Sequence, residues 1–443
     1  MTIPEGEEEA RRIAADRLRE LRADERGVGG PIRRVWRALG PGVISGAADD
    51  DPSGIATYSI AGAQFGTALL WTALVTWPLM AAVQNMCARI GMVTGRGLMS
   101  ALRRKIPRPL LIIAAITLFA ANTINVGADL AGMADAAQLL TTLSSRVWVV
   151  VFGLLIGVAT IRLRYIALAG ALKWLALVLF AYVIDALIVG PDWRAVFHDT
   201  VVPSWPRGGE MWGMLVAILG TTISPYLFFW QASQEVEEEK SKGRRRLADR
   251  VGATTKEIRV RSLDVGAGTL FSNLVMYFII LATAITLHRH GVTHPQSSRD
   301  VAEALTPLAG RFASLLYTVG LLGTGALAIP TLAGSAAYAF AEIFGWRQGI
   351  DEIYPRARAF YSAFVVSIVL GVALDFSGIN PIKALYWTAV LNGLLAPFLL
   401  VGVLIVASDA KLMRGQPTSR LGRAVVLTTT VAMFGAAIGM FVF

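Results

Sequence analysis

Long apolar stretches separated by short polar connections dominate this chain. A window of about 20 apolar residues, the length that crosses a bilayer as a helix, divides the sequence into eleven segments. We expect these segments at 38–66, 68–90, 109–137, 147–163, 166–190, 209–238, 264–287, 312–343, 357–374, 381–407 and 422–442. The pattern predicts an all-α polytopic membrane protein.

The first and the sixth segments are interrupted by residues that do not suit a membrane helix. The first carries Asp49, Asp50 and Asp51 directly before Pro52, and the sixth carries the pair Ser224-Pro225. Proline removes a helix hydrogen bond and clashes with the preceding turn, so both pairs predict points of unwinding. Carboxylates are costly inside a membrane and mark functional sites there.

The two interrupted segments lie five apart and start on opposite sides of the membrane. Interrupted helices at corresponding positions of two halves indicate an inverted repeat. This predicts a cytosolic arm (1–37), a first repeat of five helices (38–190), a second repeat (209–407) and an eleventh helix (422–442). The alternative is coincidence, because Pro78 and Pro330 also interrupt ordinary segments. The carboxylates at the first break favour the repeat.

Composition and charge agree with this class. Of 443 residues, 55% are hydrophobic and 16% are charged, against about a quarter charged in soluble proteins. With the N-terminus inside, 33 Lys and Arg residues fall on cytoplasmic connections and seven on the opposite side. The positive-inside rule then predicts a plasma (inner) membrane protein with its C-terminus outside. This placement explains the net charge of +10 without nucleic acid. No obligate protein partner is evident, and the single Cys87 excludes an intrachain disulfide.

Asp51 is the strongest candidate for binding chemistry. An unwound helix offers free carbonyl oxygens, and a carboxylate beside them completes an oxygen cage for a cation. The alternative is an ion pair with a buried Lys or Arg. The expected spans hold almost no basic residue away from their ends, so a bound cation is the better partner.

Several motifs resemble the Nramp divalent-metal transporters. They are Gly40-Pro41-Gly42, Asp51-Pro52-Ser53-Gly54, Ile55-Ala56 and Ala128-Asp129-Leu130-Ala131. The resemblance implies a LeuT-type (APC superfamily) 5+5 inverted-repeat fold and transport by alternating access. It also implies a metal held between unwound helices 1 and 6, with the backbone carbonyl of Thr221 at a ligand position.

Departures from the family pattern shift the expected ion. Gly54 stands where the family motif has Asn, and Ser224 stands where the family has a metal-binding Met. Tyr226 and Gln231 stand at two family His positions, and Gly132 stands where the family has Glu. A thioether favours soft metals and a hydroxyl does not. The site therefore resembles that of the Nramp-related magnesium transporters. We expect Mg²⁺ as substrate with Mn²⁺ also carried, and no resident cofactor.

Strict proton coupling is not expected, because His198, His288, His290 and His294 all lie outside the predicted spans. The metal gradient and the membrane potential would drive transport, the latter supplying about 4.6 kcal/mol for a dication at 100 mV. Asp129, a lone acid within a span, is the remaining candidate for carrying protons.

Other polar residues keep two interpretations each. Asp50 either attracts the ion, directly or through water, or caps a half-helix in a vestibule, and Asn392 either lines the cavity or packs between helices. The histidines of 288–294 are interpreted as a solvated loop rather than a metal cluster. The run 235–246 is interpreted as a solvated extension of the sixth helix.

Other functions remain open at this point. One is a proton-coupled Mn²⁺/Fe²⁺ transporter of the ordinary Nramp type, and another is a transporter of the same fold for a cationic organic substrate. A metal sensor is disfavoured because no sizeable soluble domain is present. No ATP-binding or hydrolase motif is found, so the chain is not expected to be an enzyme.

Overall fold

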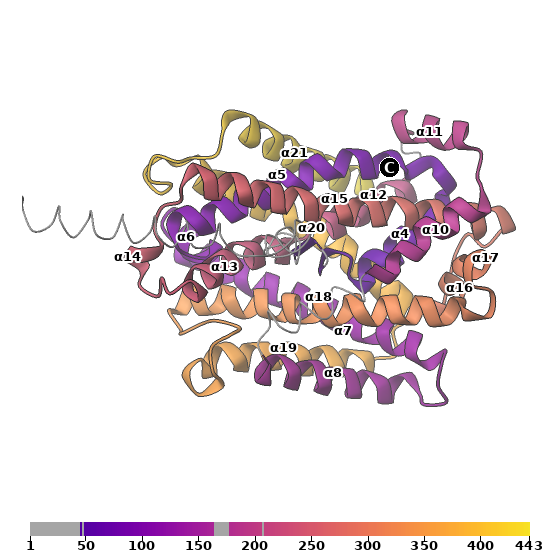
Figure 1. Ribbon diagram of the computed structural model, residues 1–443, viewed down its shortest axis with the longest axis horizontal. Coiled ribbons are helices and arrows are strands. Elements are labelled where there is room, and N and C mark those ends of the chain that lie inside the picture. Colours follow the sequence, from indigo (N-terminus) through magenta and orange to yellow (C-terminus); the bar gives the residue numbers. More distant parts are fainter. Residues whose placement is uncertain (1–44, 47, 164–176, 206–207) are drawn as a thin grey trace, which may run out of the picture. The chain divides into compact units, whose positions relative to one another are not determined.

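The computed structural model describes residues 45–46, 48–163, 177–205 and 208–443, and the secondary structure of these ranges is helical (Figure 1). The longer helices are α4 (Pro52–Phe65), α5 (Trp71–Thr94), α7 (Arg108–Gln138), α8 (Ser145–Arg162), α12 (Gly209–Thr222), α13 (Pro225–Ser241), α15 (Thr255–Thr286), α18 (Ala313–Phe344), α19 (Arg358–Asp375), α20 (Pro381–Ser408) and α21 (Arg420–Val442). The shorter ones are α6 (Leu98–Leu102), α10 (Phe180–Val189), α11 (Trp193–Val201), α14 (Leu247–Arg250), α16 (Ser298–Ala302) and α17 (Thr306–Ala309). Single 3₁₀ turns are η1 (Gly66–Leu69), η2 (Leu177–Leu179), η3 (His288–His290), η4 (Glu303–Leu305), η5 (Gly310–Phe312) and η6 (Tyr354–Arg356).

Within the described ranges, eight helices are long and apolar enough to cross a membrane. The helical segments Pro52–Leu69 and Trp71–Thr94 are bent by 109° relative to each other. They add a ninth span if the pair is counted as one. The expected arm 1–37, the start of the first span and residues 166–176 of the fifth lie outside the described residues. The second half of the fifth is the short apolar helix α10. The chain is therefore a multi-pass membrane protein.

The sixth span is broken at the predicted position. Helix α12 ends at Thr222 and α13 begins at Pro225. Between them, Ile223 and Ser224 leave the helical conformation, with ψ angles of 57° and 133°. Pro225 occupies the first turn of α13, where its missing N–H removes no helix hydrogen bond. The sequence prediction of an unwinding point here is confirmed.

Packing brings the two interrupted helices together. Helix α4 contacts both α12 and α15, while α13 packs against α5 and α18. Helix α7 contacts α18 and α19, and α8 and α19 run side by side along the lower edge of Figure 1. Glycine permits the closest of these approaches: a Cβ on Gly220 of α12 would lie 2.1 Å from the carbonyl oxygen of Ala389 in α20. Small residues at such crossings are typical of membrane helix packing.

Candidate functional site

Asp51 is positioned by the start of helix α4. It is the N-cap residue, with an extended backbone (φ −71°, ψ 169°), and Pro52 follows in the first turn. Its Oδ1 accepts hydrogen bonds from the Gly54 N–H at 2.7 Å and from the Ser53 hydroxyl at 2.9 Å. These bonds satisfy donors that a helix start leaves free. One oxygen of Asp51 is therefore committed to the cap, and Oδ2 is directed elsewhere.

Ser224 lies at the equivalent break between α12 and α13. Its hydroxyl is within donating distance of the carbonyl oxygens of Gly220 (2.8 Å) and Thr221 (2.7 Å). These carbonyls belong to the last turn of α12, where a helix has no internal donor for them. The negative end of the α12 dipole adds to their attraction for a cation. Ser224 thus lies beside two carbonyl oxygens suited to binding positive charge.

Residues at the break before α4 contact residues at the break between α12 and α13. The Tyr226 hydroxyl lies 3.3 Å from Asp51 Oδ2 and 3.2 Å from the Ala48 carbonyl oxygen. A Cβ placed on Gly54 would lie 3.0 Å from Thr221 Oγ1 and 3.4 Å from Asp51 Oδ1. Each of these side chains is at most 1% exposed. The sequence-predicted residues Asp51, Gly54, Thr221 and Tyr226 therefore form one buried cluster, and Ser224 adjoins it.

The family model described as natural resistance-associated macrophage protein-like (Nramp) matches residues 42–443 of this chain. The chain belongs to the Nramp family. Two relatives agree with this assignment, each named divalent metal cation transporter MntH. The protein from Deinococcus radiodurans is 28% identical, with 89% of this chain and 87% of that protein covered. The protein from Acidiphilium cryptum is also 28% identical, with 92% and 89% covered.

Solved structures confirm the predicted fold class. A manganese transporter of Eremococcus coleocola matches with a TM-score of 0.73 at 20% identity, over 92% of this chain and 87% of that one. The transporters MhsT and Mhp1 match with TM-scores of 0.57 and 0.55 at 13% and 16% identity. The match to MhsT covers 91% of this chain and 98% of the MhsT chain. The match to Mhp1 covers 91% of this chain and 90% of the Mhp1 chain. This Nramp-family chain therefore has the LeuT-type fold, with broken helices 1 and 6.

Asp49 and Asp50 of this Nramp-family chain face a different helix from Asp51. Both carboxylates are buried, and both lie within hydrogen-bonding distance of the Ser272 hydroxyl on α15, at 2.7 and 3.0 Å. A hydroxyl carries one proton, so Ser272 donates to only one of them at a time. Asp50, a sequence-predicted candidate, is thus separated from the Asp51 cluster by the direction of its side chain.

Helix α7 contributes two polar residues, and sequence reasoning named only one of them. Asn125 donates from Nδ2 to Asp51 Oδ2 at 3.3 Å. Asp129, one turn further along α7, is fully buried, and within the described part of the chain neither of its oxygens has a hydrogen-bond partner of regular geometry. The Ser53 backbone amide and the Asp51 carboxylate lie near it. Asn125 was missed, although its spacing of four from Asp129 places both on one helix face.

Gln231 contacts residues toward the C-terminal end of α13 rather than the cluster around Asp51. Its Nε2 donates to Glu235 at 2.7 Å, and Glu235 pairs with Arg261 of α15 at 2.9 Å. Arg261 also pairs with Asp264 at 2.6 Å and with Glu238. Glu235 is 2% exposed. The prediction that 235–246 is a solvated extension of the sixth helix was therefore wrong at Glu235, which is buried where Arg261 of α15 pairs with it.

Asn392, the remaining candidate, lies in α20 beside the close contact with α12. Its neighbour Gly393 would place a Cβ 2.2 Å from the Val216 carbonyl oxygen. Asn392 is 1% exposed, and its Nδ2 has no hydrogen-bond partner within the part of the chain that the structure describes. The structure thus places Asn392 at a buried position of α20, and whether it lines a cavity or packs between helices stays a prediction.

The donors around Asp51 define what the cluster can bind. No group of three or more His, Cys, Asp or Glu side chains suited to a metal is found among the described residues. Asp51 supplies a carboxylate to this cluster, and the neutral oxygens of Thr221, Ser224 and the α12 carbonyls supplement it. The Thr221 hydroxyl is buried, and among the described residues it has no hydrogen-bond partner of regular geometry. Hard cations that retain part of their water shell suit such oxygen ligands.

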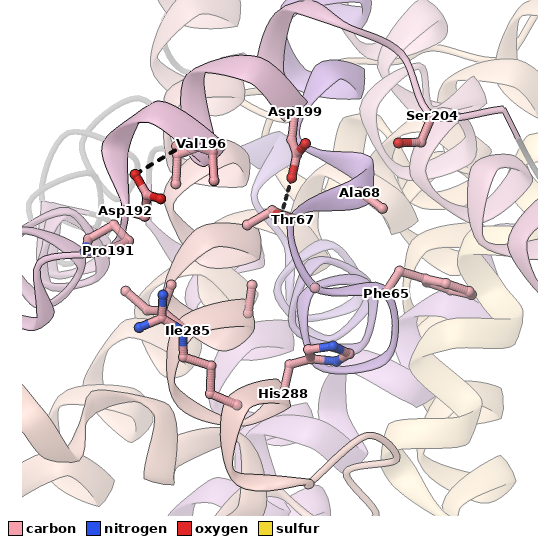
Figure 2. Close-up of a pocket in the computed structure, with 14 residues that line it drawn as sticks. Phe65, Thr67, Ala68, Pro191, Asp192, Val196, Asp199, Ser204, Ile285 and His288 are labelled. Atoms are coloured by element: carbon pink, nitrogen blue, oxygen red, sulfur yellow. Dashed lines mark hydrogen bonds between the residues drawn. The ribbon is translucent and has the colours of Figure 1, made fainter.

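A separate pocket of about 280 Å³ lies near the other end of α4, around η1 (Figure 2). Asp199 of α11 points into it and accepts a hydrogen bond from Thr67 at 2.5 Å. Burial raises the pKa of Asp199, but the hydrogen bonds from Thr67 and His198 outweigh it and hold the pKa below its usual value. His288 bonds the Ala63 carbonyl oxygen and His290 that of Thr286. These histidines hold helix ends, and none of the site candidates lines this pocket.

Proposed function

We propose that this Nramp-family protein is a secondary transporter of divalent metal cations and has no enzymatic activity. The observation that carries the proposal is the junction of the two broken helices, where Asp51 of the first break meets Tyr226 and Thr221 of the second. Relatives named divalent metal cation transporter, over nearly the whole chain, support it. The metal would bind Asp51 and the Thr221 carbonyl, with Ser224 beside them.

Mg²⁺ is the proposed preferred substrate, with Mn²⁺ also carried. The groups at the second break that lie near Asp51 offer oxygen, namely the Thr221 hydroxyl and the carbonyls beside Ser224. The Ser224 hydroxyl stands where the family pattern has a thioether. Hard oxygen ligands favour Mg²⁺ and Mn²⁺ over soft metals. The ordinary Nramp alternative, Mn²⁺ and Fe²⁺, differs from this proposal in the rank order of competing ions.

Transport without strict proton coupling is the second part of the proposal. Tyr226 and Gln231 stand at the two family histidine positions, and both are engaged in hydrogen bonds. A phenol and an amide do not exchange protons near neutral pH. Asp129, a buried acid on α7 near Asp51, could still carry protons alone. A pH-sensitive dye inside liposomes tests this, since metal-dependent acidification contradicts the proposal.

The proposed location is the plasma membrane with the N-terminus in the cytoplasm. The distribution of Lys and Arg over the connections supports this orientation. The ends of α5, α13 and α18 would then face the cytoplasm, and the pocket of Figure 2 would face outward. Cysteine labelling of substituted residues from either side of intact cells would measure it.

Metal uptake into proteoliposomes tests the central proposal. Wild-type protein is expected to carry Mg²⁺ and Mn²⁺, and Asp51→Ala is expected to abolish both. Asp249→Ala, which removes an exposed carboxylate of α14, is the matched control and should transport normally. Retained uptake by Asp51→Ala would refute the site. Inhibition by an organic amine, with no effect of a competing divalent metal, would favour an organic cation as the substrate.

A further inference from the structure

A cavity of about 1230 Å³ opens where the ends of α5, α13 and α18 converge. Its walls include the connection that leads from α5 to α6, the connection that contains α14, and the loop after α18. Among the described lining residues, eight are Lys or Arg and four are Asp or Glu. The cavity therefore carries an excess of positive charge. Such a field repels a divalent metal, so this cavity does not suit the passage of the transported ion.

The four acids in this basic cavity already have partners. Glu237 pairs with Lys240 at 2.7 Å and Glu352 with Arg347 at 3.4 Å. Glu342 accepts hydrogen bonds from the Ser100 N–H and from Gln348, and Asp351 also has a partner. Among the described residues, the cavity arginines Arg96, Arg104 and Arg250 form no ion pair with a carboxylate, although Glu342 lies near Arg96.

Those arginines are crowded together by the backbone. Arg96 lies close to Arg103, Arg104 and Arg250, and burial together with these charges lowers the pKa of Arg96. Arg250 donates to the Gly95 carbonyl oxygen at 3.4 Å, and the Gly252 N–H donates to that of Val93 at 2.9 Å. The two connections are therefore held against each other. Like charges so held repel unless an anion lies between them.

We propose that the basic cavity is a binding site for an anion with two or more phosphate charges, recognised by Arg96, Arg104 and Arg250. Guanidinium groups form paired hydrogen bonds with phosphate oxygens, and arginine remains charged at any physiological pH. The ligand source is either a free phosphate compound or a phospholipid headgroup, since both present the same chemistry. This inference is independent of the transported ion.

Binding to detergent-purified full-length protein, with metal removed by a chelator, tests the proposal. The two probes are inorganic pyrophosphate and tetraoleoyl cardiolipin, which carries two phosphate groups, with phosphatidylcholine as the lipid control. Wild-type protein is expected to bind at least one anionic probe, and added salt is expected to weaken binding. Binding of pyrophosphate alone indicates a free phosphate compound, and binding of the lipid alone indicates a headgroup. Failure of both to bind overturns the proposal.

Arginine variants connect the binding to this cavity. Arg96→Ala/Arg104→Ala is expected to weaken binding by about tenfold for each arginine removed. Arg259→Ala is the matched control, because Arg259 is exposed on α15 and does not line the cavity. Arg104→Glu, at an exposed position, provides a second variant if the double variant does not fold. Unchanged affinity in both cavity variants, or an equal loss in Arg259→Ala, overturns the proposal.

Discussion

The hydroxyl of Tyr226 lies 3.3 Å from Oδ2 of Asp51, and this contact joins the starts of two half-helices. Asp51 is the last residue before Pro52 of α4, and Tyr226 is the first residue after Pro225 of α13. The same hydroxyl lies 3.2 Å from the Ala48 carbonyl oxygen, on the preceding side of the first break. A phenol has one proton to donate, so it alternates between these acceptors, and a cation on Oδ2 would displace it from Asp51.

Tyr226→Phe is therefore expected to strengthen metal binding. The change removes a donor that competes with the metal for Asp51 Oδ2 and leaves the ring packing intact. A hydrogen bond contributes about 1 kcal/mol net, which corresponds to a fall in the transport KM of about fivefold. Initial uptake rates in proteoliposomes, measured over a range of Mg²⁺ concentrations, give this value. A rise in KM would instead mean that the phenol oxygen is itself a ligand.

Ser224→Met is expected to change which ion the protein prefers. The substitution removes the hydroxyl beside the Gly220 and Thr221 carbonyl oxygens and introduces a thioether, which favours softer metals. Competition by Cd²⁺ against Mg²⁺ uptake should increase by about tenfold, equivalent to about 1.4 kcal/mol. Ser224→Ala serves as the control, because it removes the hydroxyl without adding sulfur. Equal Cd²⁺ inhibition of both variants would show that residue 224 does not contact the ion.

The backbone of the site could be predicted from the sequence because local chemistry determines it. Proline is favoured in the first turn of a helix. Pro52 and Pro225 each follow an extended residue, and both half-helices start there as expected. The same reasoning predicted Asp51, directly before the proline, as the carboxylate at the unwinding point, and it did not predict that Asp51 caps α4. Its capping bond to Gly54 follows from this position.

The partners of these residues across helices could not be predicted in this way. Asn125 reaches Asp51 only because α7 packs at one particular rotation, which no local pattern specifies. Glu235 was predicted to be solvated because it lies in an acidic run. It is buried, and Arg261 of α15 forms an ion pair with it. The separation of Asp50 from Asp51 likewise depends on where Ser272 of α15 lies. Tertiary packing decides each of these contacts.

The buried network around Arg261 is expected to be important for stability. Removing one partner of a buried ion pair leaves uncompensated charge and costs about 3–5 kcal/mol. Arg261→Gln, which leaves Glu235 and Asp264 without their guanidinium, should lower the thermal unfolding midpoint clearly. Lys242→Ala is the control, because its pair with Glu238 is half exposed and such pairs contribute about 0–1 kcal/mol. Similar midpoints for both variants would contradict a stabilising role of the network.

Gly220 is expected to tolerate no side chain. An added Cβ would lie 2.1 Å from the Ala389 carbonyl oxygen and 2.3 Å from the Gly393 nitrogen, so α12 and α20 would have to separate. Gly220→Ala should therefore displace the carbonyls beside Ser224, reduce Mg²⁺ uptake and destabilise the protein. Gly266→Ala, in helix α15, is the matched control, because nothing lies within 4 Å of the position that its Cβ would take. Replacing such a glycine by alanine in a helix is expected to stabilise by about 0.5–1 kcal/mol. Normal uptake and an unchanged melting temperature in Gly220→Ala would mean that α12 and α20 can move apart without disturbing the break at Ser224.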